Sequence, residues 1–326
     1  MVALGESRVP VVCWVVLVAL GLTGLVTEAF EVGPAWIGGA GAVVVASAYT
    51  WALAARTGGR PLVFGTLAVA LGLVVLVVDE DYLRTGAAVL TCAVASVLGV
   101  MATVPAVRFL QVVRECVIAV VIAAIGALAT VGFEPAITVV RFEYATFGLA
   151  LVGAFGVVYR LGAGLHGLGK RGVVAVVVGS VLLVVTLLYA ELLRRYGTPA
   201  LIESLLDAVR WSRANLGAFP RPIETALGIP ALAWGVHMRA RRRQGWWVCA
   251  FGVAATSAAA NSLANPAITL RESGLSVLYG LVVGLMIGFV VIRLDLALTG
   301  SGGRGSRVAE RAAAIRPEPR RTEALL

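Results

Sequence analysis

The chain has 326 residues, of which 60% are apolar and 14% charged, and its mean hydropathy is +0.94. Soluble domains carry about 25% charged residues, so this composition excludes an ordinary water-soluble fold. The net charge of +9 lies in short segments beside apolar runs, which favours contact with membrane lipids over binding of nucleic acid.

Ten apolar runs follow one another along the chain, and each approaches the roughly 20 residues with which a helix crosses a bilayer. Only helices and closed barrels satisfy their own backbone groups there, and these runs are too long and uniform for barrel strands. The sequence therefore predicts an all-α, polytopic transmembrane helical bundle over residues 1–298. The expected spans are 9–26, 35–55, 61–78, 86–104, 116–133, 144–160, 172–190, 222–238, 246–264 and 275–293.

Basic residues concentrate in every second gap between the runs. Short loops rich in Lys and Arg stay in the cytoplasm, so the alternation predicts a multi-pass protein of the plasma membrane with both termini cytoplasmic. One outer gap, 191–222, departs from the pattern because it also contains arginines. The basic gaps contain Arg56 and Arg60; Arg108 and Arg114; Arg160, Lys170 and Arg171; and Arg239, Arg241, Arg242 and Arg243.

Two segments outside the spans have distinct patterns. Thr198 and Pro199 suit the start of a helix, and apolar and charged residues then recur at helical spacing. This pattern predicts an amphipathic helix near 198–216 that lies on the outer membrane surface or caps the bundle. Residues 299–326 are rich in Arg, Glu, Gly and Pro, and we expect a disordered basic cytoplasmic tail there.

Small residues mark a packing face on the last span. Gly280, Gly284 and Gly288 recur every four residues, which places a smooth groove along one side of a helix. We expect this face to pack against the alanine-rich ninth span of the same chain. A homo-oligomer formed through the last span is the alternative.

Polar side chains in the eighth and ninth spans are the main candidates for a site. Glu224 and Thr225 lie at the outer end of the eighth span, which Pro230 should kink. Asn261 and Asn265 are four residues apart in the ninth span, and antiparallel pairing would bring both pairs to a similar depth. Interrupted helices beside polar groups are typical of permeases, so these four are the predicted substrate-binding residues. Hydrogen bonds between helices are the structural alternative for the asparagines.

A second candidate site consists of basic residues at the cytoplasmic face. Residues 162–167 match G-x-G-x-x-G, but they follow a membrane helix and not a strand, which excludes a dinucleotide-binding fold. A P-loop is excluded as well, since Arg171 stands where magnesium coordination requires Ser or Thr. We expect contacts with lipid headgroups instead, from Arg160, Lys170, Arg171, Arg241, Arg242 and Arg243.

Catalytic motifs are missing from the sequence. It contains no H-E-x-x-H, G-x-S-x-G or Cys-x-x-Cys pattern, so we predict no catalytic residue, no metal and no cofactor. The acids Asp79 and Asp81 in an outer gap leave one enzymatic alternative, a membrane-embedded transferase that would use them over a lipid-accessible groove.

In topology and composition, the whole chain resembles uncharacterised multi-pass integral membrane proteins of actinobacteria. The resemblance implies a membrane location and supplies no site residues. Polar residues beside a broken helix favour a small-solute or lipid transporter. The alternative is a non-catalytic scaffold or accessory subunit of cell-envelope machinery, which would bind an envelope protein through its outer helix and glycine face.

Overall fold

The computed structural model describes residues 9–30, 32, 34, 36–78, 80–136, 138–163, 169–241, 245–299 and 318–325. All regular elements in these ranges are helices, which confirms the predicted all-α bundle. Seven of the described helices are long and apolar enough to cross a membrane. They comprise Val9–Glu28, Trp36–Arg56, Asp81–Met101, Phe109–Val131, Val139–Leu161, Gly172–Tyr189 and Leu270–Leu298.

Unbroken helices coincide with most of the expected spans. A π-helical turn, η1 (Tyr159–Ala163), extends the helix of the sixth expected span. Helix α3 has 17 residues, fewer than the roughly 20 with which a helix crosses a bilayer. These helices are α1 (Val9–Ala29), α2 (Trp36–Arg56), α3 (Pro61–Val77), α4 (Asp81–Met101), α5 (Phe109–Val131), α6 (Val139–Val158), α7 (Gly169–Tyr196) and α12 (Leu270–Thr299).

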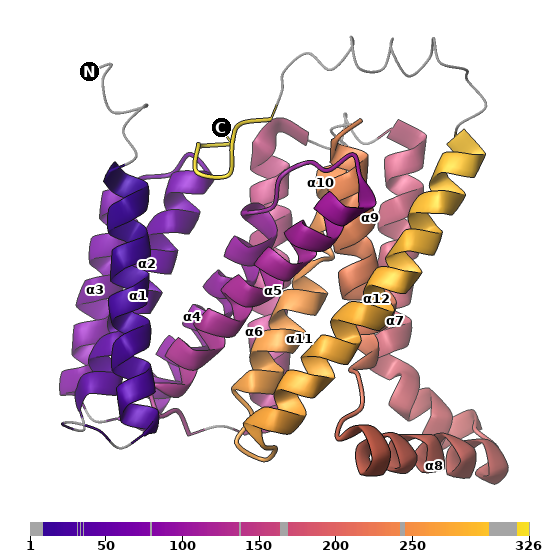
Figure 1. Ribbon diagram of the computed structural model, residues 1–326, viewed down its shortest axis with the longest axis horizontal. Coiled ribbons are helices and arrows are strands. Elements are labelled where there is room, and N and C mark those ends of the chain that lie inside the picture. The colour runs from indigo at the N-terminus through magenta and orange to yellow at the C-terminus, as the bar shows by residue number, and fades with distance from the viewer. Residues whose placement is uncertain are drawn as a thin grey trace.

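The predicted amphipathic helix forms as α8 (Pro199–Leu216). Thr198 Oγ1 accepts a hydrogen bond from the Leu201 N–H at 3.4 Å, which caps the helix start. Gly217, with a φ of 80°, ends the helix in the left-handed conformation that glycine adopts without strain. In Figure 1, α8 lies at one end of the bundle and is steeply inclined to the long helices of the bundle.

The eighth and ninth expected spans are both interrupted helices. The eighth begins as a π-helical turn, η3 (Glu224–Gly228), and continues as α9 (Ile229–Arg239). In η3 the Ile229 N–H donates to Glu224 O, five residues back, just before Pro230, which has no N–H to donate. The ninth divides into α10 (Gly245–Ala250) and α11 (Val253–Leu263). A Cβ atom at Gly252, in the break, would lie 2.8 Å from Leu232 Cδ1, so the break lets this segment approach α9 closely.

These interrupted helices occupy the interior of the bundle. Nearly all residues of α9, α10 and α11 are buried, whereas α1 and α7 bury only a few of their described side chains. One apolar cluster joins α4, α5, α6, η3, α9, α10, α11 and α12, and a second joins α1, α2, α3, α4, α5, α6 and α11. Helices α4, α5, α6 and α11 contribute to both clusters and so connect the two parts of the bundle.

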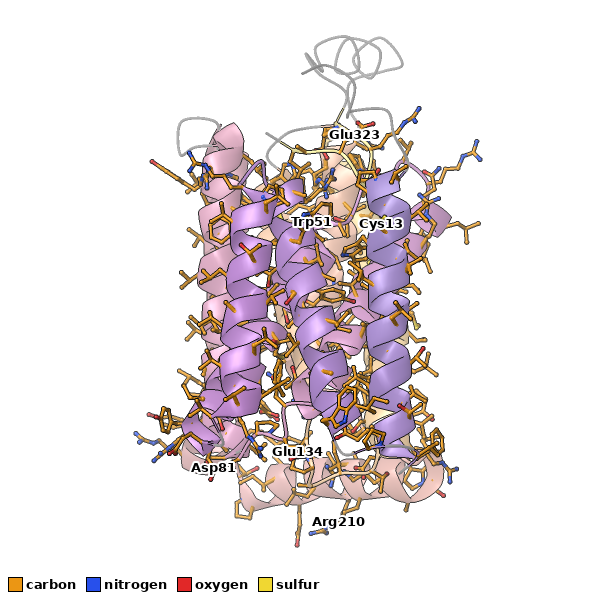
Figure 2. The ribbon with its side chains drawn as sticks, turned by 90° about the vertical axis from the view of Figure 1, so that its left-hand side faces the viewer. Cys13, Trp51, Asp81, Glu134, Arg210 and Glu323 are labelled. Carbon is orange, nitrogen blue, oxygen red and sulfur yellow. The ribbon has the colours of Figure 1, made fainter. Side chains whose placement is uncertain are left out.

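Figure 2 shows which residues lie at each end of the bundle. Asp81, Glu134 and Arg210 lie at one end, which we call the distal end; Cys13 and Glu323 lie at the opposite, proximal end. The N-terminal turn of α1 and the described C-terminal residues are therefore at the same end of the molecule (Figures 1 and 2).

Residues 318–325 differ from the expected disordered tail. They form a compact segment in which the Arg320 N–H donates to Glu323 Oε2 and the Glu323 N–H donates to Arg320 O, each at 3.0 Å. The Leu325 N–H donates to Arg56 O at 2.8 Å, which attaches the segment to α2. The sequence pattern failed here because a segment poor in apolar residues can still bind through buried charges.

The glycine face of α12 packs against η3 and α9. A Cβ atom at Gly284 would lie 2.6 Å from Ile229 Cβ, and one at Gly288 would lie 2.9 Å from Ala233 Cβ. The expected partner, the ninth span, therefore does not cover these glycines. Residue spacing identifies a smooth face on a helix, but it does not identify the neighbour that packs there.

Replacing Gly284 by Ala should destabilise the bundle, because the new methyl group would overlap Ile229 Cβ. Gly274→Ala in the same helix is the matched control, since a Cβ atom there meets nothing within 4 Å. We expect Gly284→Ala to lower the free energy of unfolding by about 1–3 kcal/mol and the control to leave it unchanged or raise it by up to about 1 kcal/mol. Thermal unfolding of both variants in detergent measures the difference, and equal transitions would contradict the close contact.

Candidate functional site

A buried carboxyl group is the central feature of the interrupted eighth span. Glu224 is 0% exposed, and neither of its side-chain oxygens has a hydrogen-bond partner. Arg221, one turn earlier, pairs instead with Glu143 of α6, with 2.8 Å between Nη1 and Oε1. The nearest guanidinium in the sequence is therefore engaged elsewhere, and the Glu224 carboxyl lies in an apolar surrounding without a donor.

Gly280 of α12 provides the space for this carboxyl group. A Cβ atom at Gly280 would lie 2.6 Å from Glu224 Cδ and 2.8 Å from each carboxyl oxygen. Any larger residue at this position would displace the Glu224 side chain. The first glycine of the face therefore faces a polar group, whereas Gly284 and Gly288 face apolar side chains.

The local backbone around Glu224 is irregular for reasons that the sequence explains. Pro230 cannot donate to the carbonyl of Ala226, and the chain accommodates this with the π-helical turn η3. Gly228 in the same turn lies directly against Ala255 of α11, where a Cβ atom would overlap the neighbouring backbone. Glu224 thus lies at a widened helical turn between two closely packed helices, α11 and α12.

The structure does not join the four predicted substrate-binding residues into one site. Thr225 Oγ1 donates within its own helix, to Arg221 O at 3.0 Å. Asn265 lies beyond the end of α11, and its Oδ1 accepts the Ala267 N–H at 2.9 Å in a half-exposed turn. These two residues are therefore occupied by local contacts.

Asn261 links three helices. Its Oδ1 accepts a hydrogen bond from Thr146 Oγ1 of α6 at 2.9 Å, and Cys92 Sγ of α4 lies 3.6 Å away. The residue is buried, as are both of these neighbours. This arrangement matches the structural alternative, a hydrogen bond between helices. No hydrogen bond joins any two of Glu224, Thr225, Asn261 and Asn265.

Only part of the predicted headgroup-binding set falls within the described structure. Arg160 is exposed in η1, and Arg241 is half-buried after α9. The Lys170 and Arg171 side chains and the whole of Arg242 and Arg243 lie outside the described residues, as does most of the glycine-rich segment 162–167.

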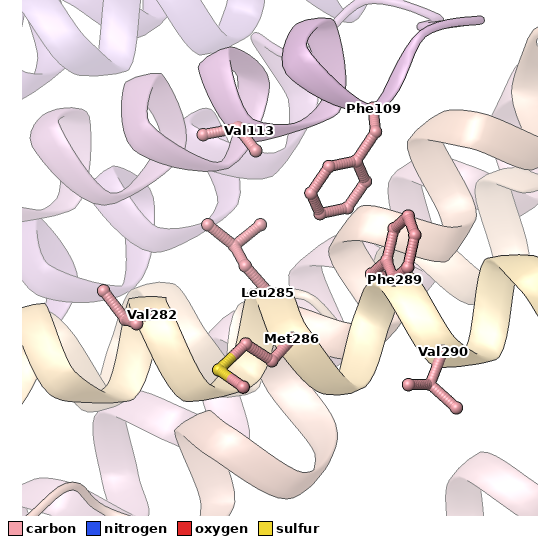
Figure 3. Close-up of a pocket in the computed structure, with 7 residues that line it drawn as sticks. All are labelled: Phe109, Val113, Val282, Leu285, Met286, Phe289 and Val290. Carbon is pink, nitrogen blue, oxygen red and sulfur yellow. The ribbon is translucent and has the colours of Figure 1, made fainter.

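A groove between α5 and α12 has a volume of about 510 Å³ (Figure 3). Its lining is almost entirely apolar, and Phe109 of α5 meets Phe289 of α12 edge-on with ring centroids 5.0 Å apart. It contains none of the predicted site residues. The lining residues are Phe109, Val113, Val282, Leu285, Met286, Phe289 and Val290.

A second, shallow pocket at the distal end has a volume of about 470 Å³ and is lined in part by Asp81, Tyr82 and Thr85. Asp79, the other acid of the transferase alternative, lies outside the described residues. Within the described part of the chain, no group of three or more His, Cys, Asp or Glu side chains could hold a metal ion.

Sequence reasoning missed a cluster of buried charges at the proximal end. Arg56 and Arg239 are 4% and 5% exposed, and Glu115 is 0% exposed. The expected span 116–133 leaves Glu115 one residue outside, but α5 begins at Phe109 and carries it into the interior. The succession Arg114-Glu115 directly before an apolar run was the available signal.

Comparisons of the chain with protein-family models, with curated protein sequences and with solved structures give no significant match.

Removal of the Asn261 side chain should destabilise the bundle through loss of its hydrogen bond to Thr146. A double-mutant cycle of Asn261→Ala and Thr146→Val should give a coupling free energy of about 0.6–1.7 kcal/mol, the range for such bonds between membrane helices. Asn265→Ala serves as the control, because its Oδ1 contacts only a neighbouring backbone N–H. Unfolding in detergent measures the cycle, and a coupling energy near zero would show that the contact has no energetic weight.

Proposed function

We propose that the chain is a cation-coupled membrane transporter of a small solute or lipid, and that Glu224 binds the coupling proton or sodium ion. The observation that supports this most directly is the carboxyl group of Glu224, fully buried without a hydrogen-bond donor at a π-helical turn. An ionised carboxylate in such a place needs a positive charge nearby, which a proton or a small cation supplies. π-helical turns are frequent at functional sites.

The helices around Glu224 suit a binding site that must open alternately to the two sides of the membrane. Transporters commonly place their ion and substrate sites at interrupted helices in the interior of the bundle. Here η3–α9 and α10–α11 are interrupted, and the smooth glycine face of α12 covers η3 and α9. A face without interlocking side chains allows α12 to shift along η3 and thereby expose or cover Glu224.

We further propose that the chain crosses the plasma membrane ten times with both termini in the cytoplasm. Seven crossings correspond to the long apolar helices, and α3, η3–α9 and α10–α11 provide the other three. Arg56, Arg108 and Arg239 lie at helix ends toward the proximal side, and the positive-inside rule favours the cytoplasm for them. Membrane lipids then surround α1, α3 and α7, whose side chains are mostly exposed.

A scaffold function remains a second candidate because of α8. Leu201, Leu205, Leu206 and Trp211 are exposed on this helix, and Trp211 is 60% exposed. The proposed orientation places α8 at the outer membrane surface, where such a face would contact lipid headgroups or an envelope protein. The buried Glu224 carboxyl has no role in a scaffold, so its importance for activity distinguishes the two functions.

Substitution of Glu224 by Gln should abolish cation coupling while preserving the fold. The protein is reconstituted into liposomes on a solid-supported membrane, and charge movement is recorded on jumps of pH or sodium concentration and on addition of a panel of solutes. We expect currents in the parent protein and their loss in Glu224→Gln. The Gln amide has nearly the same shape as the carboxyl group, but it neither releases a proton nor carries the negative charge that binds a cation. Infrared difference spectra over the same pH range should lose the signal of a titrating carboxyl group.

Glu143→Gln is the matched control for this experiment. Its carboxyl group is 33% exposed and pairs with Arg221 close to Glu224 in the chain. It should retain the currents of the parent protein. Equal currents and spectra in the parent and in Glu224→Gln would refute the assignment of Glu224 and shift the balance to the scaffold.

The proposed orientation predicts opposite accessibility for two engineered cysteines. In a Cys13→Ser background, Ser204→Cys in α8 should react with a membrane-impermeant thiol reagent in intact cells. Arg60→Cys, between α2 and α3, should react only after the membrane is opened. Both positions are exposed, and the three other cysteines are buried. The reverse pattern would show that the orientation is opposite to the proposed one. Labelling of both cysteines from the same side would contradict the proposed number of crossings between them.

A further inference from the structure

Two buried arginines at the proximal end have no negative partner among the described residues of the helical bundle. The Arg239 guanidinium donates to Thr103 Oγ1 at 2.8 Å and to Thr103 O at 3.1 Å, and it lies 3.4 Å from the centre of the Trp246 ring. Arg56 Nε donates to Met101 O at 3.0 Å. These contacts fix the positions of both guanidinium groups, but they provide no charge compensation.

Residues 318–325 supply the missing acceptors. The Glu318 carboxylate forms a two-point contact with Arg239, through Nη2 and, at 3.3 Å, through Nε. Arg56 Nη1 donates to two carbonyl oxygens of the segment, that of Arg320 at 2.7 Å and that of Glu323. One buried arginine thus holds a side chain of the segment, and the other holds its backbone turn.

In a third contact the charges are reversed, because the bundle provides the carboxylate and the segment provides the arginine. Glu115 is 0% exposed and accepts the Val104 N–H at 3.0 Å, and Arg114 approaches it from the solvent side. Arg321 Nη2 donates to both Glu115 oxygens, at 2.8 and 2.9 Å, and its Nη1 donates to Ala102 O at 3.1 Å. The segment therefore presents one carboxylate and one guanidinium to two sites of complementary charge.

The neighbouring arginine shows how selective this fit is. Arg320 has the same charge as Arg321 and adjoins it, but its side chain is exposed and makes no hydrogen bond or ion pair with the described part of the chain. Leu325, at the other end of the segment, packs against the apolar cluster of α4, α9 and α10. Ion pairs, hydrogen bonds and an apolar contact thus all favour the same position of residues 318–325 on the proximal end.

We infer that the proximal end of the bundle is a peptide-binding site and that the chain's own residues 318–325 are its ligand. The site consists of Arg56, Thr103, Glu115, Arg239 and Trp246, and it recognises an acidic residue and, three positions later, an arginine. Because residues 300–317 connect the ligand covalently to α12, binding is intramolecular and favoured by a high effective concentration. The inference holds whether or not Glu224 couples to a cation.

Binding of this segment reinforces helix ends that already contact one another through the Arg56–Met101 and Arg239–Thr103 hydrogen bonds. Its partners come from the end of α2, the connection between α4 and α5, the N-terminal part of α5 and the end of α9. Those ends belong to both apolar clusters of the bundle. A bound segment therefore strengthens the contacts between the proximal ends. Its release removes the Glu318 carboxylate from Arg239 and two of the three carbonyl acceptors from Arg56, which leaves both buried charges less compensated.

Distances between two spin labels on the full-length chain test the inference. One label is placed on Cys13, the exposed native cysteine of α1, and the other on Ala324→Cys, an exposed position of the segment. A bound segment gives a single narrow distance distribution. Arg321→Gln should raise the broad, released fraction by about tenfold or more, since it removes the two hydrogen bonds from Arg321 to the buried Glu115 and leaves Arg114 as its cationic partner. Glu318→Gln should act in the same direction through Arg239.

Arg320→Gln is the matched control, because it removes the same charge from the adjacent residue and should leave the narrow distribution unchanged. A broad distribution in the parent protein would overturn the inference. It would also be overturned if Arg321→Gln retained the narrow distribution, or if Arg320→Gln released the segment equally. All four proteins should unfold at similar temperatures if the bundle itself is intact, which separates release of the segment from loss of the fold.

Discussion

Backbone hydrogen bonding in an apolar surrounding is the constraint on which the arrangement of this bundle depends. An unpaired N–H or C=O group in hydrocarbon raises the free energy by several kcal/mol, so helices that face lipid must be continuous. The exposed helices α1 and α7 are continuous, whereas η3–α9 and α10–α11, with their π turn and their break, lie where protein surrounds them. Irregular backbone is thus confined to the interior, and only there can a glycine or proline rearrange the helix without exposing it to lipid.

Close approach of helices follows from the same arrangement. Gly228 lies against Ala255, Gly284 against Ile229, and Gly252 against Leu232, so the interrupted helices and α12 meet at nearly backbone distance. Without a hydrophobic driving force between helices in lipid, such contacts and the few hydrogen bonds between helices hold the bundle together. The Asn261–Thr146 bond belongs to this set and joins α11 to α6.

The extent to which sequence predicted this molecule depends on the kind of signal. Apolar runs predict helices because the hydrophobic pattern and the backbone requirement point to the same structure, and the all-α bundle and α8 are confirmed. Asn261 and Asn265 were assigned to one helical face, but α11 ends at Leu263, so the four-residue spacing no longer applies. The partner of the glycine face and the place of residues 318–325 depend on contacts between distant parts of the chain, which periodicity does not encode.

The two groups of buried charges differ in a way that bears on function. At the proximal end each buried charge has an opposite charge or a carbonyl group within hydrogen-bond distance, which is the pattern of a structural or regulatory contact. Glu224 has neither, and Gly280 leaves room for its carboxyl group where a larger residue could pack against an apolar side chain. An apolar residue of similar shape at position 224 would make the bundle more stable, since buried charges rarely repay their desolvation. Packing therefore does not explain Glu224, whereas the proposed binding of a cation at this carboxyl group would.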